Sequence, residues 1–360
     1  MNSFIDDEIR MLGETVARFT ADRAGAAAPS ADALWREFAD LGWLALPYSE
    51  EAGGLGLGKA GVFTVMHGHG NGLLQSPYLP VSVLSGGVLA RCARGAEPLA
   101  QMMEGTLRIA PAFVVAGTET QAGTPKLAAT STADGFRLNG ADINVLAVDA
   151  ADAVLAAATI GDGGEIGLFL VPLDTAGITT RPYKMIDGRA AGHVTFADVA
   201  VPASARLDDD AGARAILDQV RSEALIAAAA ENLGAMQSLY EQTLDYAKLR
   251  KQFGRAIGSF QTLQFRLVDM WIKLDEARSL VSAAAEAQDD GELAALATAA
   301  WIQALWSGRH IAEEAVQIHG AIAMTEEYSV GNYVKRMLVN ELLFGAPERH
   351  LARYRSLQAD

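Results

Sequence analysis

The chain has 360 residues, of which 50% are hydrophobic and 20% charged, and its formal net charge is −15. This composition predicts a globular protein with a sizeable core, and the acidic balance argues against binding to nucleic acid or an anionic membrane, since both need a basic face. One cysteine, no apolar run of the ~20 residues that a membrane-spanning helix needs, and a start without signal-peptide character predict a cytosolic protein without disulfides.

The first segment, residues 1–107, has helical patterning. In ADALWREFADLGWLAL the apolar residues recur at spacings of four and three, which is typical of one helix face. The glycine-rich stretch EEAGGLGLG follows this helix. A dinucleotide-binding loop should follow a buried strand, so we interpret the stretch as a surface turn.

The middle segment, residues 108–207, changes to short apolar runs separated by turn residues. Pairs such as Asp134-Gly135 and Asp187-Gly188 are typical of hairpin turns. No run alternates with a long helix, which disfavours a doubly wound parallel sheet. This segment is therefore predicted to be a small β domain.

The last segment, residues 208–360, is helical again. One apolar stripe continues over five turns in steps of four and three residues, through Leu263, Leu267, Met270, Leu274, Ala277 and Val281. We expect four to five long helices packed as a bundle. The chain is thus predicted to be mainly α with a β domain in its middle.

This order of segments resembles the acyl-CoA dehydrogenase family over nearly the whole chain. The matching stretches are LWREFADLGWLALPYSEEAGGLGLG, HVTFADVAVPAS, YAKLRKQFGRAIGSFQTLQFRLVDM and AVQIHGAIAMTEEYSVGNYVKR. The resemblance implies an N-terminal helical domain, a middle β-barrel domain and a C-terminal four-helix bundle. It also implies an FAD-dependent enzyme that desaturates an acyl-CoA thioester between its α and β carbons.

The resemblance assigns a cofactor contact to the turn RKQFGRAIGSFQ. In the family, residues matching Arg250, Phe253 and Gln261 reach the diphosphate and adenosine of a neighbouring subunit's FAD. A guanidinium gives a fixed fork of donors for phosphate, and a phenyl face packs on a flat ring. The alternative is a helix corner in which the arginine only caps helix carbonyl groups.

A second cofactor contact in the family is a glutamine followed by paired glycines. The matching positions are Gln317 and Gly320, and the second glycine is Ala321 in this chain. A methyl group at that position restricts how closely a ligand approaches the backbone.

The β domain departs from the family pattern where it should hold the flavin ring of its own subunit. The turn matching the family's Thr-Glu-Pro-Gly is AGTETQAGTP at residues 116–125. Counting from the hairpin Asn139-Gly140, Asn144 stands at the family's tryptophan and Leu146 at its hydroxyl residue. Leucine has no donor for the ring, so this half of the flavin site is predicted to be degraded.

The catalytic base is also missing from its usual positions. In most family members a glutamate near the C-terminus removes the α-proton, and the matching residue here is Phe344. In a minority the base lies on the first helix of the bundle, where the match is Ala224. Its neighbour Glu223 is our candidate base, and Glu341 is a weaker one.

Other kinds of site have little support. His67 and His69 are two residues apart and have no third ligand nearby in the sequence, so we predict no metal site. The chain has no Gly-x-Ser-x-Gly elbow and no P-loop.

Three hypotheses follow. In the first, the chain is one subunit of a heteromeric α2β2 acyl-CoA dehydrogenase, which shares FAD across an interface and whose partner supplies the base. In the second, it is a self-sufficient homotetramer that uses Glu223. In the third, it is a non-catalytic scaffold. The resemblance allows fatty, steroid, aromatic or dicarboxylic acyl groups.

Overall fold

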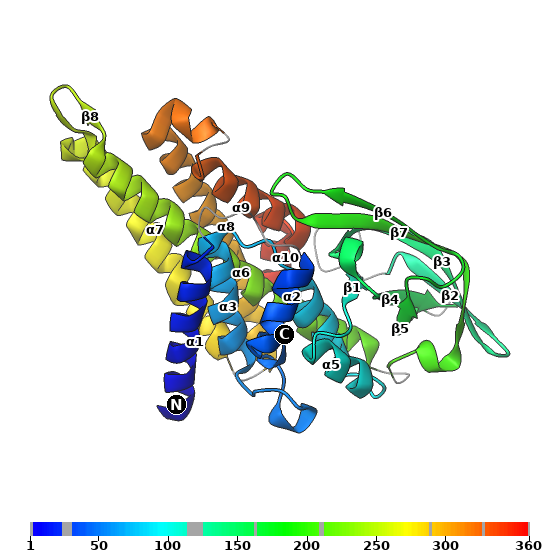
Figure 1. The fold of residues 1–360 in the computed structure, drawn as a ribbon. Coiled ribbons are helices and arrows are strands. Elements are labelled where there is room, and N and C mark those ends of the chain that lie inside the picture. Colours follow the sequence, from blue (N-terminus) through cyan, green and yellow to red (C-terminus); the bar gives the residue numbers. More distant parts are fainter. Residues whose placement is uncertain are drawn as a thin grey trace. The chain divides into compact units, whose positions relative to one another are not determined.

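The computed structural model describes residues 3–23, 31–113, 125–161, 164–208, 212–287, 290–325 and 328–358 (Figure 1). The α-helices are α1 Ser3–Ala21, α2 Ala31–Asp40, α3 Gly58–Gly72, α4 Gly86–Leu89, α5 Ala96–Met103, α6 Ala213–Leu249, α7 Gln261–Glu286, α8 Asp290–His319, α9 Val330–Phe344 and α10 Pro347–Leu357. The strands are β1 Ile109–Ala112, β2 Leu127–Thr132, β3 Gly135–Leu146, β4 Ala153–Ile160, β5 Glu165–Pro172, β6 Ile178–Lys184, β7 Ala190–Pro202, β8 Lys251–Gln252 and β9 Arg255–Ala256.

The chain divides into two compact units, each built from separated segments. The helical unit consists of Met1–Ala27, Lys59–Leu74 and Leu225–Asp360. The sheet unit consists of Ala28–Gly58 and Gln75–Ala224. The helical, β and helical order predicted from the sequence is present, whereas the boundaries at residues 107 and 207 stay a prediction.

The sheet unit contains a seven-stranded mixed sheet with the path β1-β4-β2-β3-β7-β6, and β5 pairs with β4. Strands β1 and β2 both pair with β4 in parallel, and the remaining pairs are antiparallel. The two hairpins predicted from Asp134-Gly135 and Asp187-Gly188 are confirmed as β2–β3 and β6–β7.

The sheet buries an apolar core because its strands place small and branched side chains on one face. Central members of this core are Val154, Phe169, Val194 and Phe196, each at most 2% exposed. Strand β4, AVLAAATI, is buried over its first six residues. Such a continuous apolar run is typical of a strand that is covered on both faces.

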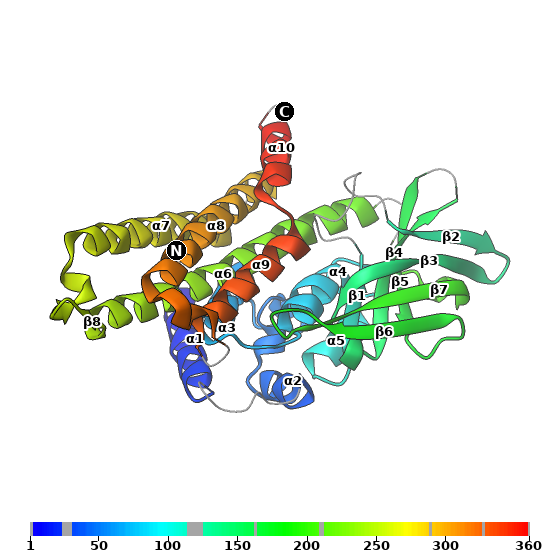
Figure 2. The ribbon, with the colours of Figure 1, turned by 90° about the horizontal axis from the view of Figure 1, so that it is seen from above.

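The helical unit is a bundle in which most of the predicted apolar stripe lies on the buried face of α7. Leu263 is half-buried, and the other five residues of the stripe are buried, namely Leu267, Met270, Leu274, Ala277 and Val281. Figures 1 and 2 show α7 and α8 lying side by side. Helix α3 packs against α6 at two glycines: a Cβ at Gly70 would lie 1.8 Å from the Glu231 carbonyl oxygen, and one at Gly234 would lie 1.9 Å from that of His67.

In the part of the chain that the structure describes, no helix combines the length and apolar character needed to cross a membrane.

Candidate functional site

Arg250, Phe253 and Gln261, the predicted cofactor clamp, lie on or beside a hairpin at one end of the helical unit (Figure 2). Strands β8 and β9 are joined by the two residues Phe253 and Gly254, whose φ angles are +52° and +82°. Two successive left-handed residues form the tight turn that suits a two-residue hairpin. Glycine adopts this conformation freely, but a phenylalanine there is strained by about 1–2 kcal/mol.

Phe253 is held in this strained conformation without being buried. Its side chain is 92% exposed, and its ring approaches that of Phe260 edge to face, with 6.2 Å between the ring centroids. Packing therefore does not compensate for the backbone strain. Strain without compensation is typical of positions kept for a function, and the predicted role of Phe253 in contacting FAD is consistent with it.

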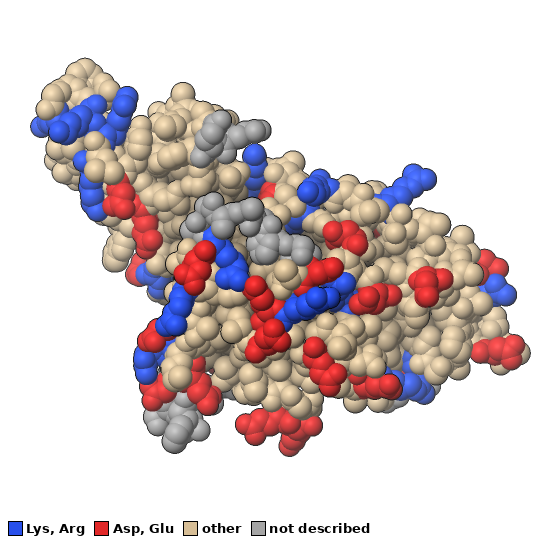
Figure 3. Space-filling view, viewed as in Figure 1, with Lys and Arg blue, Asp and Glu red and all other residues tan. Residues whose placement is uncertain are grey.

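The hairpin also concentrates positive charge. Figure 3 shows Lys and Arg side chains gathered at the end of the molecule that carries β8 in Figure 1, where the sequence places Arg250, Lys251 and Arg255. The guanidinium of Arg255 lies over the ring of Phe260, 4.1 Å from its centroid. Arg250 is exposed, and among the described residues its guanidinium has no hydrogen bond or ion pair.

Gln261 begins α7 after the 3-10 turn Ile257–Ser259 that follows the hairpin, and its side chain is exposed. The preceding residue, Phe260, offers no side-chain cap to the helix. The first backbone N–H groups of α7 therefore have no side-chain cap from this residue, and the partial positive charge of a helix start favours an anion. The three residues predicted to contact FAD thus share one hairpin and helix junction.

The second predicted contact, Gln317 and Gly320, lies at the end of α8. His319 stacks on Tyr246 of α6 with 4.4 Å between ring centroids, and the Tyr246 hydroxyl donates to the His319 carbonyl oxygen at 3.4 Å. Tyr246 also accepts a hydrogen bond from the Arg250 backbone at 2.8 Å. Tyr246 therefore links the end of α8 to the clamp.

Gly320 has a φ angle of +68°, and a Cβ built on it would meet no atom within 4 Å. The side chain of Gln317 is exposed. Gly320 and the side chain of Gln317 are thus accessible to an external molecule. Burial lowers the pKa of His319, whose ring is therefore neutral near pH 7.

The position that matches the usual catalytic base holds a buried aromatic side chain, Phe344. Phe344 is 1% exposed and packs edge-to-face against Trp301 at 5.8 Å between ring centroids. The Trp301 indole nitrogen donates to the Gly345 carbonyl oxygen at 3.0 Å, and Nε2 of His350 bonds to the Phe344 carbonyl oxygen at 2.8 Å. This position therefore has no proton acceptor. Glu341, one turn earlier, forms an ion pair with Arg309 at 3.0 Å.

The alternative base position has no carboxylate either. Ala224 is fully buried. Its neighbour Glu223 accepts a hydrogen bond from Arg91 at 2.6 Å, and the side chains of this ion pair are 20% and 27% exposed. A carboxylate beside a guanidinium is stabilised in its ionised form, which makes it a weaker proton acceptor. The role of Glu223 as a base stays a prediction.

The part of the β domain predicted to have lost its contacts with the flavin ring lies at a bulge of strand β3. The pairing with β7 shifts between Asp142 and Val145, and Asn144 has a φ angle of +61°. Asn144 Oδ1 accepts a hydrogen bond from the Tyr183 hydroxyl at 2.5 Å, and Leu146 is buried. Leu146 therefore has no donor for the flavin ring, and the Asn144 oxygen is engaged by Tyr183. Of the turn at residues 116–125, all but the last residue lie outside the described residues.

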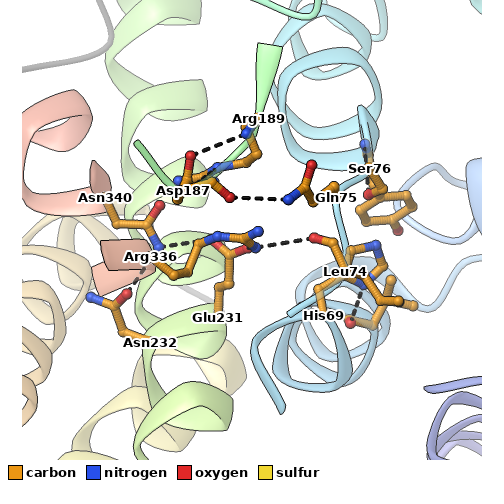
Figure 4. Close-up of polar contacts among 12 residues, drawn as sticks. His69, Leu74, Gln75, Ser76, Asp187, Arg189, Glu231, Asn232, Arg336 and Asn340 are labelled. Carbon is orange, nitrogen blue, oxygen red and sulfur yellow. Dashed lines mark hydrogen bonds and ion pairs between the residues drawn. The ribbon is translucent and has the colours of Figure 1, made fainter. Parts of the chain in front are cut away.

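Sequence reasoning missed a buried polar network in the helical unit (Figure 4). Glu231 accepts from Arg336 and from Asn340, both at 2.7 Å. Arg336 also donates to the Leu74 carbonyl oxygen at 3.0 Å, and Asn340 donates to Asn232 at 2.9 Å. In the sequence, this network is marked only by Glu231 and Asn232, two polar residues that interrupt an alanine-rich run. Their partners lie more than 100 residues away, at a separation that no helical spacing reveals.

The two histidines considered as metal ligands are engaged in other contacts. Nε2 of His67 lies 3.2 Å from Gln237 Oε1, and Nδ1 of His69 lies 2.7 Å from the Val65 carbonyl oxygen. Burial lowers the pKa of His69 to about 4. No group of three potential metal ligands occurs among the described residues.

Comparison with known proteins gives consistent matches along the chain. The model of the acyl-CoA dehydrogenase N-terminal domain matches residues 6–92, and that of the C-terminal domain matches residues 210–355. Acyl-CoA dehydrogenase IpdE2 of Mycobacterium tuberculosis is 30% identical over 364 residues, covering 97% of each chain. Benzylmalonyl-CoA dehydrogenase of Aromatoleum aromaticum is 28% identical over 355 residues, covering 93% of each chain. The ChsE4-ChsE5 complex from Mycobacterium tuberculosis contains a similar chain, with a TM-score of 0.85, 26% identity and coverage of 98% and 97%.

Proposed function

The chain belongs to the acyl-CoA dehydrogenase family, and on this premise we propose that it is one subunit of a heteromeric acyl-CoA dehydrogenase whose partner supplies the catalytic base. Members of the family are FAD-dependent oxidoreductases that act on acyl-CoA thioesters. The main observation behind this proposal is that a buried apolar side chain, Phe344, stands at the position of the usual base.

The clamp residues fit the role of holding FAD across an interface. Arg250 would bind the diphosphate, and Phe253 would pack on a flat ring. The amides of Gln261 and Gln317 would bond to polar edges, and Gly320 would allow close approach to the backbone. All five residues are exposed. When bound, FAD would supply the acceptor for the hydride that leaves the β-carbon of the thioester.

The other half of the chemistry needs a carboxylate that removes a proton from the α-carbon. Among the matched positions of this chain, Phe344 and Ala224 cannot accept a proton, and Glu223 is engaged by Arg91. A related subunit that keeps the glutamate would complete the reaction. The solved ChsE4-ChsE5 complex supports this arrangement, because a similar chain there belongs to an assembly of two differently named proteins.

The experiment compares the chain purified alone with the chain co-produced with a related dehydrogenase subunit encoded beside it. We expect the chain alone to lack bound flavin and turnover, and the complex to carry flavin and oxidise an acyl-CoA. A yellow, active chain without a partner would favour the homotetramer that uses Glu223. Flavin in neither preparation would favour the scaffold.

A further inference from the structure

The two groups of residues predicted to contact FAD lie at the ends of two different helices. Arg250 directly follows α6, whereas Gln317 and Gly320 lie at the end of α8. The last four carbonyl groups of a helix have no partner within it, so helix ends fray unless other contacts hold them. A ligand that uses both groups therefore needs a contact that keeps these two helix ends together.

Tyr246, in the last turn of α6, makes such a contact. Its ring stacks on that of His319, the last residue of α8, with 4.4 Å between the ring centroids and 29° between the ring planes. Its hydroxyl donates to the His319 carbonyl oxygen at 3.4 Å. Its backbone carbonyl oxygen accepts a hydrogen bond from the Arg250 N–H at 2.8 Å. Tyr246 thus contacts both the end of α8 and the residue that begins the hairpin.

The imidazole of His319 is oriented from within its own helix. Nδ1 lies 2.8 Å from the Ala315 carbonyl oxygen, which can only accept, so Nδ1 carries the proton. The residue is 4% exposed, and its Nε2 is buried without a hydrogen-bond partner among the described residues. The ring is therefore positioned by this one bond and by its aromatic neighbours.

The chain beyond Gly320 returns to α6 next to this stack. The ring of Tyr328 lies 5.2 Å from that of His319, measured between centroids. The hydroxyl of the next residue, Ser329, donates to Oε1 of Gln242 at 2.5 Å, and Gln242 lies one turn before Tyr246 on α6. The turn at Gly320 is thus held on α6 from both sides.

We propose that Tyr246 is a positioning residue for FAD, because its stack on His319 holds the end of α8 on the end of α6, from which the hairpin of Arg250 continues. The inference rests on the proposed function, since it takes the FAD contacts of Arg250, Gln317 and Gly320 as given. Helix ends that are ordered before the cofactor arrives raise its affinity, because binding does not have to order them.

The first test requires no flavin. It measures hydrogen exchange of the backbone amides of residues 316–325 in the isolated chain. Tyr246→Leu removes the stack, and since an aromatic pair shifts an equilibrium by roughly two- to tenfold, exchange should accelerate by this factor. Tyr246→Phe keeps the ring and should not accelerate it. The matched control is Tyr240→Leu, the same change at a half-buried tyrosine on another face of α6.

The second test titrates FAD into the apo complex and follows the flavin fluorescence. Tyr246→Leu should weaken FAD binding by roughly two- to tenfold. Tyr246→Phe loses only a hydroxyl bond of 3.4 Å, which is long for two oxygen atoms, so its FAD affinity should stay within about twofold of wild type. Tyr240→Leu should leave FAD affinity unchanged even where it lowers the melting temperature.

Unchanged exchange in Tyr246→Leu, or faster exchange with unchanged FAD affinity, would overturn the inference. An equal loss of affinity in Tyr246→Phe would place the effect in the hydroxyl and contradict the role of the stack, and an equal loss in Tyr240→Leu would reduce it to general destabilisation. A wild-type complex that binds no FAD would instead refute the proposed function, and the exchange measurement would still decide whether Tyr246 orders the end of α8.

Discussion

Replacing Glu231 by glutamine should destabilise the protein far more than a loss of surface charge. The side chains of Glu231 and Arg336 are 3% and 1% exposed, and both carboxylate oxygens accept from donors at 2.7 Å. A glutamine keeps one acceptor and turns an NH₂ group toward Arg336 or Asn340, which are themselves donors. Breaking a buried pair in this way costs about 3–5 kcal/mol, because the charge of Arg336 stays buried without its partner.

The assay is urea unfolding followed by far-UV circular dichroism. Glu14→Gln is the matched control, since the Arg10–Glu14 pair is 62% and 63% exposed and should contribute less than about 1 kcal/mol. The double variant Glu231→Leu with Arg336→Leu should lose less stability than Glu231→Gln alone, because it leaves no buried charge. A Glu231→Gln loss no larger than that of the control would refute this reasoning.

Three further predictions concern the hairpin and a buried histidine. Arg250→Lys should weaken FAD binding to the assembled complex by roughly ten- to a hundredfold and leave the melting temperature of the isolated chain unchanged. Unchanged FAD affinity together with a large drop in that melting temperature would mean that Arg250 only stabilises the turn between two helices. Phe253→Asn should stabilise the isolated chain by about 0.5–1 kcal/mol in urea, because Asn-Gly suits this turn, while FAD binding weakens; no gain in stability would argue against strain. Burial lowers the pKa of His69 to about 4, so between pH 6.5 and 4 the unfolded chain binds a proton at this ring that the folded chain does not bind. The free energy of unfolding should therefore fall by up to about 3 kcal/mol as pH falls through that window. An NMR titration midpoint near pH 6 for this ring would contradict the prediction.

Regular features could be predicted because they depend on local periodicity. The stripe from Leu267 to Val281 follows the helical repeat, and it forms the buried face of α7. The hairpins at Asp134-Gly135 and Asp187-Gly188 follow from turn chemistry. In both cases the residues that determine the structure lie within a few positions of one another.

Features that depend on distant partners could not be predicted. Glu231 and Asn232 were visible only as an interruption in an alanine-rich run, because Arg336 and Asn340 reach them from another helix. The pairing of Glu223 with Arg91 spans 132 residues. The left-handed conformation of Phe253 was also hidden, since phenylalanine has no preference for it.

The central claim, that the base belongs to a partner subunit, is tested most directly by Glu223→Gln in the assembled complex. Glutamine keeps the size of the side chain and can still accept a hydrogen bond from Arg91, but it cannot act as a base. Turnover is measured per bound flavin with the acyl-CoA that the complex oxidises. If the partner supplies the base, most of the wild-type turnover remains. A loss of ~10³-fold or more with flavin still bound would show that Glu223 is the base and would contradict the proposed role of the partner.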